Sequence, residues 1–136
     1  MSKKGASYQK ELIVEKGHLD DLNHVNNVVY VRWINDISEE HWEQITTPEL
    51  ENDYFWVVLR HEIDYLGQAL LGDALTIKTR VGETGGVKSV REIYIYKNQS
   101  LLVKAKTTWC LINRKTLKPQ RIGDDVLKVL FVSESL

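Results

Sequence analysis

Residues 20–30 read Asp-Asp-Leu-Asn-His-Val-Asn-Asn-Val-Val-Tyr, a polar run that passes directly into an apolar repeat. From Val29 to Ile45 apolar side chains recur every three to four residues, which is typical of one face of an amphipathic helix. A helix of about twenty residues is roughly 30 Å long, enough to run the length of a small domain. The first N–H groups of a helix have no partner within it, and they attract anions. The sequence therefore predicts a base, from Asp20 or His24, beside an anion-binding helix start.

The rest of the chain mostly alternates with a period of two, which is typical of strands. Residues 7–15 predict a first strand, although Lys10 interrupts the alternation. Pro48 should end the long helix, because the residue before a proline is pushed out of helical dihedrals, and residues 49–53 predict an acidic loop. Four further strands are expected, bounded by turns rich in glycine and asparagine: residues 57–65, 75–81, 87–96 and 101–113. One face of the first of these should carry Val57, Leu59, His61, Ile63 and Tyr65.

These patterns indicate an α+β fold in which a curved antiparallel sheet of about five strands wraps one long helix. Residues 124–132 predict a short final helix, with Asp124 or Asp125 favouring the dipole in its first turn. No repeat, low-complexity segment or linker divides the chain. Residues 1–136 are therefore expected to form a single domain, with residues 1–6 as a flexible terminus.

The composition is that of an ordinary soluble domain. The 136 residues are 43% hydrophobic and 27% charged, which suits one globular unit with its own core. Eighteen basic residues against nineteen acidic ones give a net charge of −1, which offers no general attraction for nucleic acid. The single cysteine, Cys110, cannot form an internal disulfide, and neither an apolar signal core nor a run of eighteen apolar residues is present. We therefore expect a cytoplasmic protein that does not enter a membrane.

The polar run resembles the signature of the hotdog-fold thioesterases, the 4-hydroxybenzoyl-CoA thioesterase-like group, and is similar to a stretch of the plant acyl-carrier-protein thioesterases. The matching positions are Asp20, His24, Val25, Asn26, Asn27 and Tyr30. His18 stands where the family often has its first Asp, and Asn23 stands where it usually has Gly. The resemblance implies a hotdog fold and the hydrolysis of acyl-CoA or acyl-carrier-protein thioesters without a cofactor. It also implies a homodimer, or a tetramer of dimers, in which each site draws on two chains.

The resemblance assigns catalytic roles to Asp20, His24 and Asn27. Asp20 either attacks the thioester carbonyl, giving an anhydride, or activates water as a general base, and the sequence leaves both routes open. The backbone N–H of Asn27, with that of Asn26, would stabilise the oxyanion. His24 would orient Asp20, contact the carbonyl or hold the loop in shape. Substrate contacts are expected from four residues: Asn26, Val28, Tyr30 and Gln68.

For several binding roles the sequence offers more than one candidate residue. The plant enzymes have a second carboxylate near the position of Gln68, whose amide could position water but could not act as a base. Candidates for an apolar acyl slot are Val28, Val29, Trp33 and Trp56. Candidates for contacts with the phosphates of coenzyme A are Lys88, Arg91, Arg114, Lys115 and Lys118.

The residues alone also permit other interpretations. Asp20 could be a loop carboxylate that caps the backbone, and the asparagines at the helix start could satisfy only their own chain. A hotdog hydratase or dehydratase would need a histidine paired with an acid for proton transfer, and a non-catalytic acyl-binding or regulatory module would bind without hydrolysis. The histidines and the cysteine lack metal-ligand spacing, and no Gly-x-Ser-x-Gly elbow is present, so neither a metal nor a serine nucleophile is expected.

Overall fold

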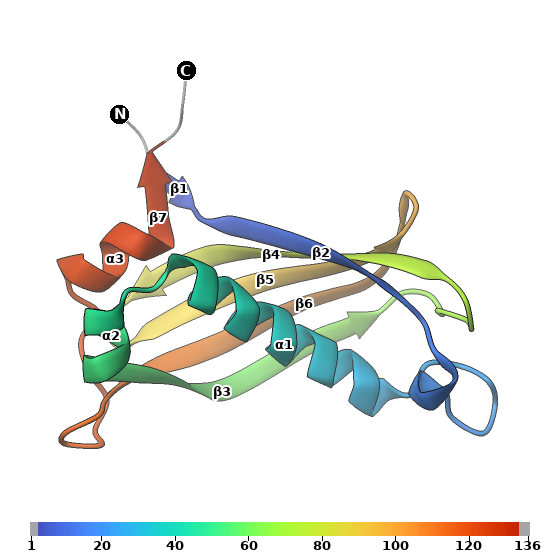
Figure 1. The fold of residues 1–136 in the computed structure, drawn as a ribbon, viewed down its shortest axis with the longest axis horizontal. Coiled ribbons are helices and arrows are strands. Elements are labelled where there is room, and N and C mark those ends of the chain that lie inside the picture. The colour runs from blue at the N-terminus through green and yellow to red at the C-terminus, as the bar shows by residue number, and fades with distance from the viewer. Residues whose placement is uncertain (1–2, 134–136) are drawn as a thin grey trace.

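The computed structural model describes residues 3–133, in which a long helix lies across one main sheet (Figure 1). The members of the sheet are β2 (Ser7–Ile13), β3 (Tyr54–Tyr65), β4 (Ala74–Gly85), β5 (Lys88–Lys97) and β6 (Ser100–Asn113). They are antiparallel and lie in the order β2, β4, β5, β6, β3. The other elements are β1 (Lys3–Gly5), the 3-10 helix η1 (Lys16–His18), α1 (Asn27–Ile45), α2 (Pro48–Asp53), α3 (Asp124–Leu130) and β7 (Phe131–Ser133). The predicted α+β architecture is confirmed.

The long helix α1 buries one stripe of side chains against the sheet. The buried residues are Val29, Tyr30, Trp33, Ile34, Ile37, Ser38 and His41, which recur with the predicted helical period. The apolar ones share a core with inner-face residues of the central strands, among them Leu75, Ile77, Ile93 and Ile95. Burying one such isoleucine stabilises the fold by roughly 2 kcal/mol. No helix among residues 3–133 is both long and apolar enough to cross a membrane.

The edge strand β3 contains a bulge that the alternation does not predict. Its pairing with β6 skips Leu59, which has no partner in the ladder. One extra residue reverses which side chains face the core. Trp56 therefore packs into the core before the bulge, and Ile63 packs into it after the bulge. The prediction that Val57 and Leu59 share a face with Ile63 is wrong for this reason.

The two ends of the described chain pair with each other (Figure 1). β1 and β7 form a two-stranded antiparallel ribbon, and the N–H of Ala6 donates to the Leu130 carbonyl oxygen at 2.8 Å. A Cβ at Gly5 would lie 1.8 Å from the carbonyl oxygen of Val81, so only glycine allows the two backbones to approach this closely. Residues 3–6 are thus part of the fold, in contrast to the flexible terminus that the sequence predicts. Residues 1–2 lie outside the described part of the chain.

A short helix replaces the acidic loop predicted after α1. Pro48 is the first residue of α2, where its missing N–H costs nothing, and Thr47 Oγ1 accepts a hydrogen bond from the N–H of Leu50 at 3.2 Å. The predicted final helix ends at Leu130, because the chain leaves it there to pair with β1. α2 and α3 lie at the end of the sheet opposite the start of α1 (Figure 1). The start of α1 therefore lies at one end of the molecule, and the two short helices lie at the other.

Candidate active site

The polar run forms a closed loop between η1 and α1. The N–H of Asn26 donates to the His18 carbonyl oxygen at 2.9 Å, and a β-bridge joins Leu19 to Val25, so the two ends of the loop are held together. The ring of His18 packs edge-on against Trp33, with ring centroids 5.1 Å apart. Where the family signature often has a carboxylate, His18 therefore fastens the loop to α1.

Asp20 shapes the turn of this loop with one carboxylate oxygen. Its Oδ1 accepts hydrogen bonds from the N–H groups of Leu22 (2.9 Å) and His24 (3.1 Å). No residue between 3 and 133 donates a hydrogen bond to its Oδ2. Asn23 has a left-handed φ of 62°, which asparagine tolerates better than most residues, so it can replace the glycine of the signature. The capping and catalytic interpretations of Asp20 are compatible, because each uses a different oxygen.

The start of α1 leaves one backbone donor free. Asn26 caps the helix: its Oδ1 accepts from the N–H of Val28 at 3.0 Å, and its carbonyl oxygen accepts from the N–H of Val29 at 2.9 Å. The N–H of Asn26 is itself engaged by His18. Nothing in the described part of the chain accepts a hydrogen bond from the N–H of Asn27. Of the two N–H groups predicted as oxyanion donors, only that of Asn27 is available, at the positive end of the α1 dipole.

Tyr30 ties the loop between β3 and β4 to the helix start. Its side chain is 2% exposed, and its hydroxyl accepts from the N–H of Ala69 at 3.2 Å. Burial raises the pKa of Tyr30 above its ordinary value. The N–H of Val25 donates to the carbonyl oxygen of Ala69 at 3.3 Å, and the neighbouring Gln68 is exposed. Tyr30 thus positions the loop that carries Gln68, and contact of either residue with substrate stays a prediction.

His24 and Val28 lie at the solvent side of the helix start. The imidazole of His24 is half-buried and makes no side-chain hydrogen bond with residues 3–133, so its predicted role stays a prediction. Val28 is 64% exposed. Other exposed apolar residues of the segments that meet at this end are Ile13, Leu22, Tyr65, Leu66, Leu70 and Leu71. A cluster of exposed apolar side chains marks a surface that contacts a ligand or another protein.

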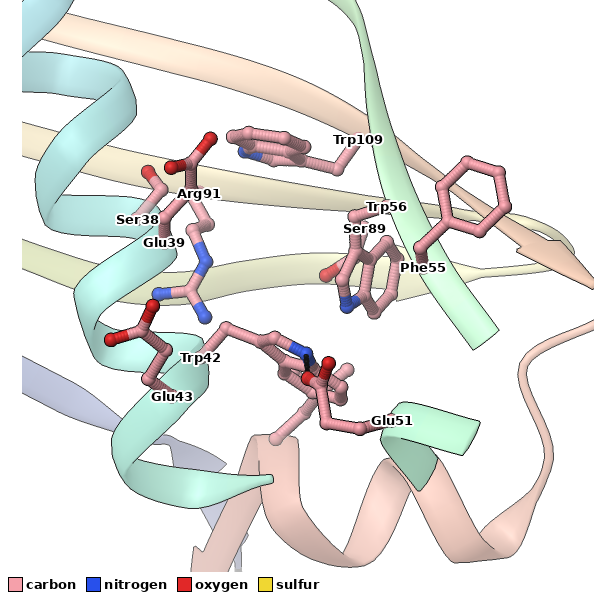
Figure 2. Close-up of a pocket in the computed structure, with 11 residues that line it drawn as sticks. Ser38, Glu39, Trp42, Glu43, Glu51, Phe55, Trp56, Ser89, Arg91 and Trp109 are labelled. Carbon is pink, nitrogen blue, oxygen red and sulfur yellow. Dashed lines mark hydrogen bonds between the residues drawn. The ribbon is translucent and has the colours of Figure 1, made fainter. Parts of the chain in front are cut away.

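A cavity of about 220 Å³ lies at the other end of α1 (Figure 2). Four aromatic residues and one arginine dominate its lining: Trp42, Phe55, Trp56, Trp109 and Arg91. We call it the aromatic cavity. Of the residues predicted to form an acyl slot, only Trp56 lines it. Val29 and Trp33 belong to the core under the first half of α1, and Val28 is at the surface there.

Arg91 is a buried cation in the wall of the aromatic cavity. Its side chain is 5% exposed, it forms no ion pair among the described residues, and its Nη1 donates to His41 Nδ1 at 2.6 Å. Because arginine only donates, His41 must be neutral at this nitrogen. Burial, together with the charge of Arg91, lowers the pKa of His41 to about 4, and burial lowers the pKa of Arg91 to about 10. Arg91 is therefore still charged at neutral pH.

Arg91 was one of five candidates for contacts with the phosphates of coenzyme A, and its burial removes its guanidinium from the surface. On β5 it alternates with Ile93 and Ile95, and all three side chains are buried on the inner face. This alternation was a signal in the sequence that Arg91 points inward. His41 and Trp109 also escaped notice as site residues, because an apolar pattern predicts burial but does not reveal a cavity beside the buried ring.

The chain matches the acyl-ACP thioesterase N-terminal domain over residues 5–130. The chloroplastic acyl-[acyl-carrier-protein] hydrolase FATB3 of Cuphea viscosissima is 31% identical over 83 residues, which cover 59% of this chain and 20% of that protein. The crystal structure of a probable thioesterase from Bartonella henselae is 27% identical, with a TM-score of 0.76 over 87% of this chain and 100% of that one. A predicted thioesterase from Bacillus stearothermophilus has a TM-score of 0.82 at 24% identity, over 92% and 94% of the two chains.

The long helix on a five-stranded antiparallel sheet is the hotdog fold of these thioesterase structures. The chain belongs to the acyl-ACP thioesterase family, through the N-terminal domain that defines it. This confirms the resemblance found in residues 20–30. The chain spans about one fifth of the Cuphea hydrolase that it matches. The roles of Asp20, His24 and Asn27 stay predictions.

Proposed function

We propose that the protein hydrolyses acyl thioesters to a carboxylic acid and a thiol at the start of α1. The observation that supports this best is the free N–H of Asn27 next to the loop that presents Asp20. A thiolate leaves easily, so the reaction needs little help from a general acid. It does need a nucleophile and a donor to the oxyanion. One carboxylate and one backbone N–H meet both needs.

The free Oδ2 of Asp20 suits two routes. As a general base, it takes a proton from water while the water oxygen bonds to the carbonyl carbon. The carbonyl electrons move onto oxygen, and the N–H of Asn27 donates to that oxyanion. When the C=O bond re-forms, the C–S bond breaks and the thiolate leaves with the electron pair. As a nucleophile, Oδ2 bonds to the carbonyl carbon itself, and the C–S bond breaks as the thiolate leaves, which gives an anhydride. Water then cleaves the anhydride, which releases the carboxylic acid and restores the Asp20 carboxylate.

We also propose that a second copy of the chain completes each site. β3 is an edge strand of 12 residues whose outer side pairs with no strand among residues 3–133. Such an edge favours pairing with another strand. Two β3 strands that pair antiparallel about a two-fold axis place the start of one beside the end of the other.

This arrangement would bring the two candidate regions together. Within one chain, Asn27 and the cavity residues Ser38 and Trp42 are separated by roughly 16 to 22 Å along α1. The aromatic cavity borders the start of β3, and the loop after β3 contacts the helix start. In the proposed dimer the aromatic cavity of one chain therefore lies next to the helix start of the other, where it can receive the acyl group.

A thiol-release assay tests the activity. Purified protein is incubated with acyl-CoA and acyl-carrier-protein thioesters of increasing chain length and with aromatic acyl groups, and we expect turnover of at least one series. Binding without thiol release would favour the non-catalytic module, and hydration or dehydration of the acyl chain without thiol release would favour the hydratase. The family match favours acyl carrier protein as carrier, and the paired assay compares it with coenzyme A.

Light scattering tests the assembly. We expect the mass of a dimer, or of a tetramer built from dimers, at micromolar concentration. A stable and active monomer of 15.8 kDa would contradict the shared site.

A further inference from the structure

Trp109 and Arg91 bring hydrogen-bond donors to the aromatic cavity, and the donor of Trp109 lacks an acceptor within residues 3–133. Trp109 is 8% exposed, and its Nε1 is buried without a partner. Arg91 is 5% exposed and hydrogen-bonds only to His41. Figure 2 shows both side chains in the space between α1 and the sheet. Leaving a buried donor such as Trp109 Nε1 unpaired costs about 1 to 3 kcal/mol, which favours a ligand that brings an acceptor.

The charge of Arg91 favours an anionic acceptor. Its hydrogen-bond partner His41 is neutral, so this contact does not balance the charge of the guanidinium. The nearby carboxylate of Glu51 is already engaged, because its Oε1 accepts from Trp42 Nε1 at 2.6 Å and its Oε2 lies 3.8 Å from Arg114 Nη2. A buried cation without a counter-ion is unfavourable. A carboxylate on the ligand would remove this penalty.

Two other carboxylates at the cavity do not reverse this preference. Glu39 and Glu43 line its rim from α1, and both are exposed. Neither forms an ion pair with Arg91 among the described residues. Water weakens the field of exposed charges far more than that of a buried one. At the depth of the cavity the field of Arg91 therefore dominates.

The size of the cavity limits the ligand. An apolar cavity of roughly 150 Å³ holds benzene. A cavity of about 220 Å³ therefore has room for a body of about six carbons together with a small polar group. The indoles of Trp42 and Trp56, whose centroids are 5.5 Å apart, offer apolar walls to that body.

We infer that the aromatic cavity receives the far end of the acyl group, and that Arg91 and Trp109 select an acyl group that ends in a carboxylate. The inference rests on the proposed function, because the thioester itself is cleaved at the helix start of the second copy. His41 is a positioning residue, since its acceptor nitrogen holds the guanidinium in place.

A binding experiment tests the site without catalysis. Tryptophan fluorescence reports on the cavity, so the wild-type protein is titrated with hexanoate and with its neutral isostere hexanamide. We expect hexanoate to bind at least about tenfold more tightly, the factor that one charge-assisted hydrogen bond provides. Arg91→Met, which keeps most of the side-chain length, should abolish the difference. Trp109→Phe, which keeps a ring but removes the N–H, should reduce it.

A kinetic experiment tests selection by the same residues. The ratio of kcat/KM for adipyl-CoA to that for hexanoyl-CoA compares two six-carbon acyl groups that differ only in the terminal carboxylate. We expect a ratio above one in the wild type and a fall of at least about tenfold in Arg91→Met. Arg121→Met is the matched control, because Arg121 is exposed and lies outside the cavity. Thermal melting shows which variants fold. If Arg91→Met does not fold, the wild-type ratio and the ratio for Trp109→Phe test the inference.

The results distinguish this inference from the proposed function. Equal binding of hexanoate and hexanamide, or equal hydrolysis of the two thioesters by the wild type, would overturn the inference alone. Tighter binding of butyltrimethylammonium than of hexanoate would also overturn it, in favour of a cation held by the aromatic rings. If no thioester is hydrolysed but hexanoate binding depends on Arg91, the proposed function fails and the carboxylate site stands.

Discussion

At the start of α1 the groups available to a ligand are the backbone N–H of Asn27 and one oxygen of Asp20, whereas at its far end they are the side chains of Arg91 and Trp109. The first pair is held by hydrogen bonds within residues 18–30. The second pair comes from β5 and β6 and faces α1 only when the sheet has formed. The proposed bond cleavage thus depends on local backbone geometry, and the proposed choice of acyl group depends on tertiary packing.

The largest expected effect concerns the carboxylate at the helix start. Asp20→Asn should lower kcat for thioester hydrolysis by at least about a hundredfold and leave KM within severalfold. The amide oxygen can still accept from Leu22 and His24, so the loop keeps its shape while the base or nucleophile is lost. Asp21→Asn is the control and should be mild, since Asp21 is exposed. If steady-state kinetics rank the two variants in the reverse order, the motif is aligned one residue out of place.

A second pair of variants distinguishes the contribution of the Asn27 backbone N–H from that of the Asn27 side chain. Asn27→Ala should keep much of the activity, whereas Asn27→Pro should lower kcat by about a hundredfold because it deletes the oxyanion donor. Proline is tolerated at the first residue of a helix, and Asn26 already has the extended dihedrals that a following proline requires (φ −64°, ψ 137°). Circular dichroism and light scattering check that the proline variant is folded and assembled. Equal inactivation by both variants would show that the side chain matters instead.

His41, beside the aromatic cavity, should control how the stability of the protein depends on pH. The pKa of His41 is about 4 in the folded protein, below its ordinary value of 6.5, so the unfolded chain binds a proton more readily. Stability from this group is complete above pH 6.5 and is lost as the pH falls toward 4. Between pH 8 and pH 5 we expect a loss of about 2 kcal/mol in the free energy of unfolding by urea. His41→Gln, which keeps an acceptor for Arg91, should show a loss smaller by that amount, and an unchanged loss would contradict the neutral His41.

The smallest predicted effect concerns the support of the helix start. Tyr30→Phe leaves the buried N–H of Ala69 without its acceptor and should lower the free energy of unfolding by about 1 to 2 kcal/mol. Tyr65→Phe is the matched control, because its ring lies 5.7 Å from that of Tyr30 but Tyr65 is 44% exposed. Chemical denaturation of the two variants should therefore differ. If they unfold alike, the hydrogen bond to Ala69 contributes nothing measurable.

The two regions also differ in how far the sequence predicts them. Residues 20–30 are contiguous, so their pattern predicts the polar loop and the helix start. The left-handed φ of Asn23 was seen only in the structure. The engagement of the Asn26 N–H by His18 was not predictable, because it depends on how the loop closes. The pairing of Arg91 with His41 joins residues 50 positions apart. They meet only when α1 packs against the sheet.

The helix and most strands follow their periodicity closely, and the exceptions have physical causes. α2 forms because Thr47 caps a helix that Pro48 can begin, a local alternative to the predicted loop. The ribbon of β1 and β7 needs a partner from the other end of the described chain, which no local pattern reveals. The same holds for Gly5, whose role is to let another strand approach.

The unpaired Leu59 divides β3 into two halves. The alternation of inward and outward side chains is shifted by one residue between them. Trp56, in the first half, belongs to the aromatic cavity, and Ile63, in the second half, belongs to the core near the helix start. Deleting Leu59 would restore regular alternation, so the side chains of one half of the strand would move to the opposite face of the sheet. Within this strand, the distance between the two regions can change only by an even number of residues. In family members that act on acyl groups of other lengths, we therefore expect the loops around β3 to differ and the bulge to be kept.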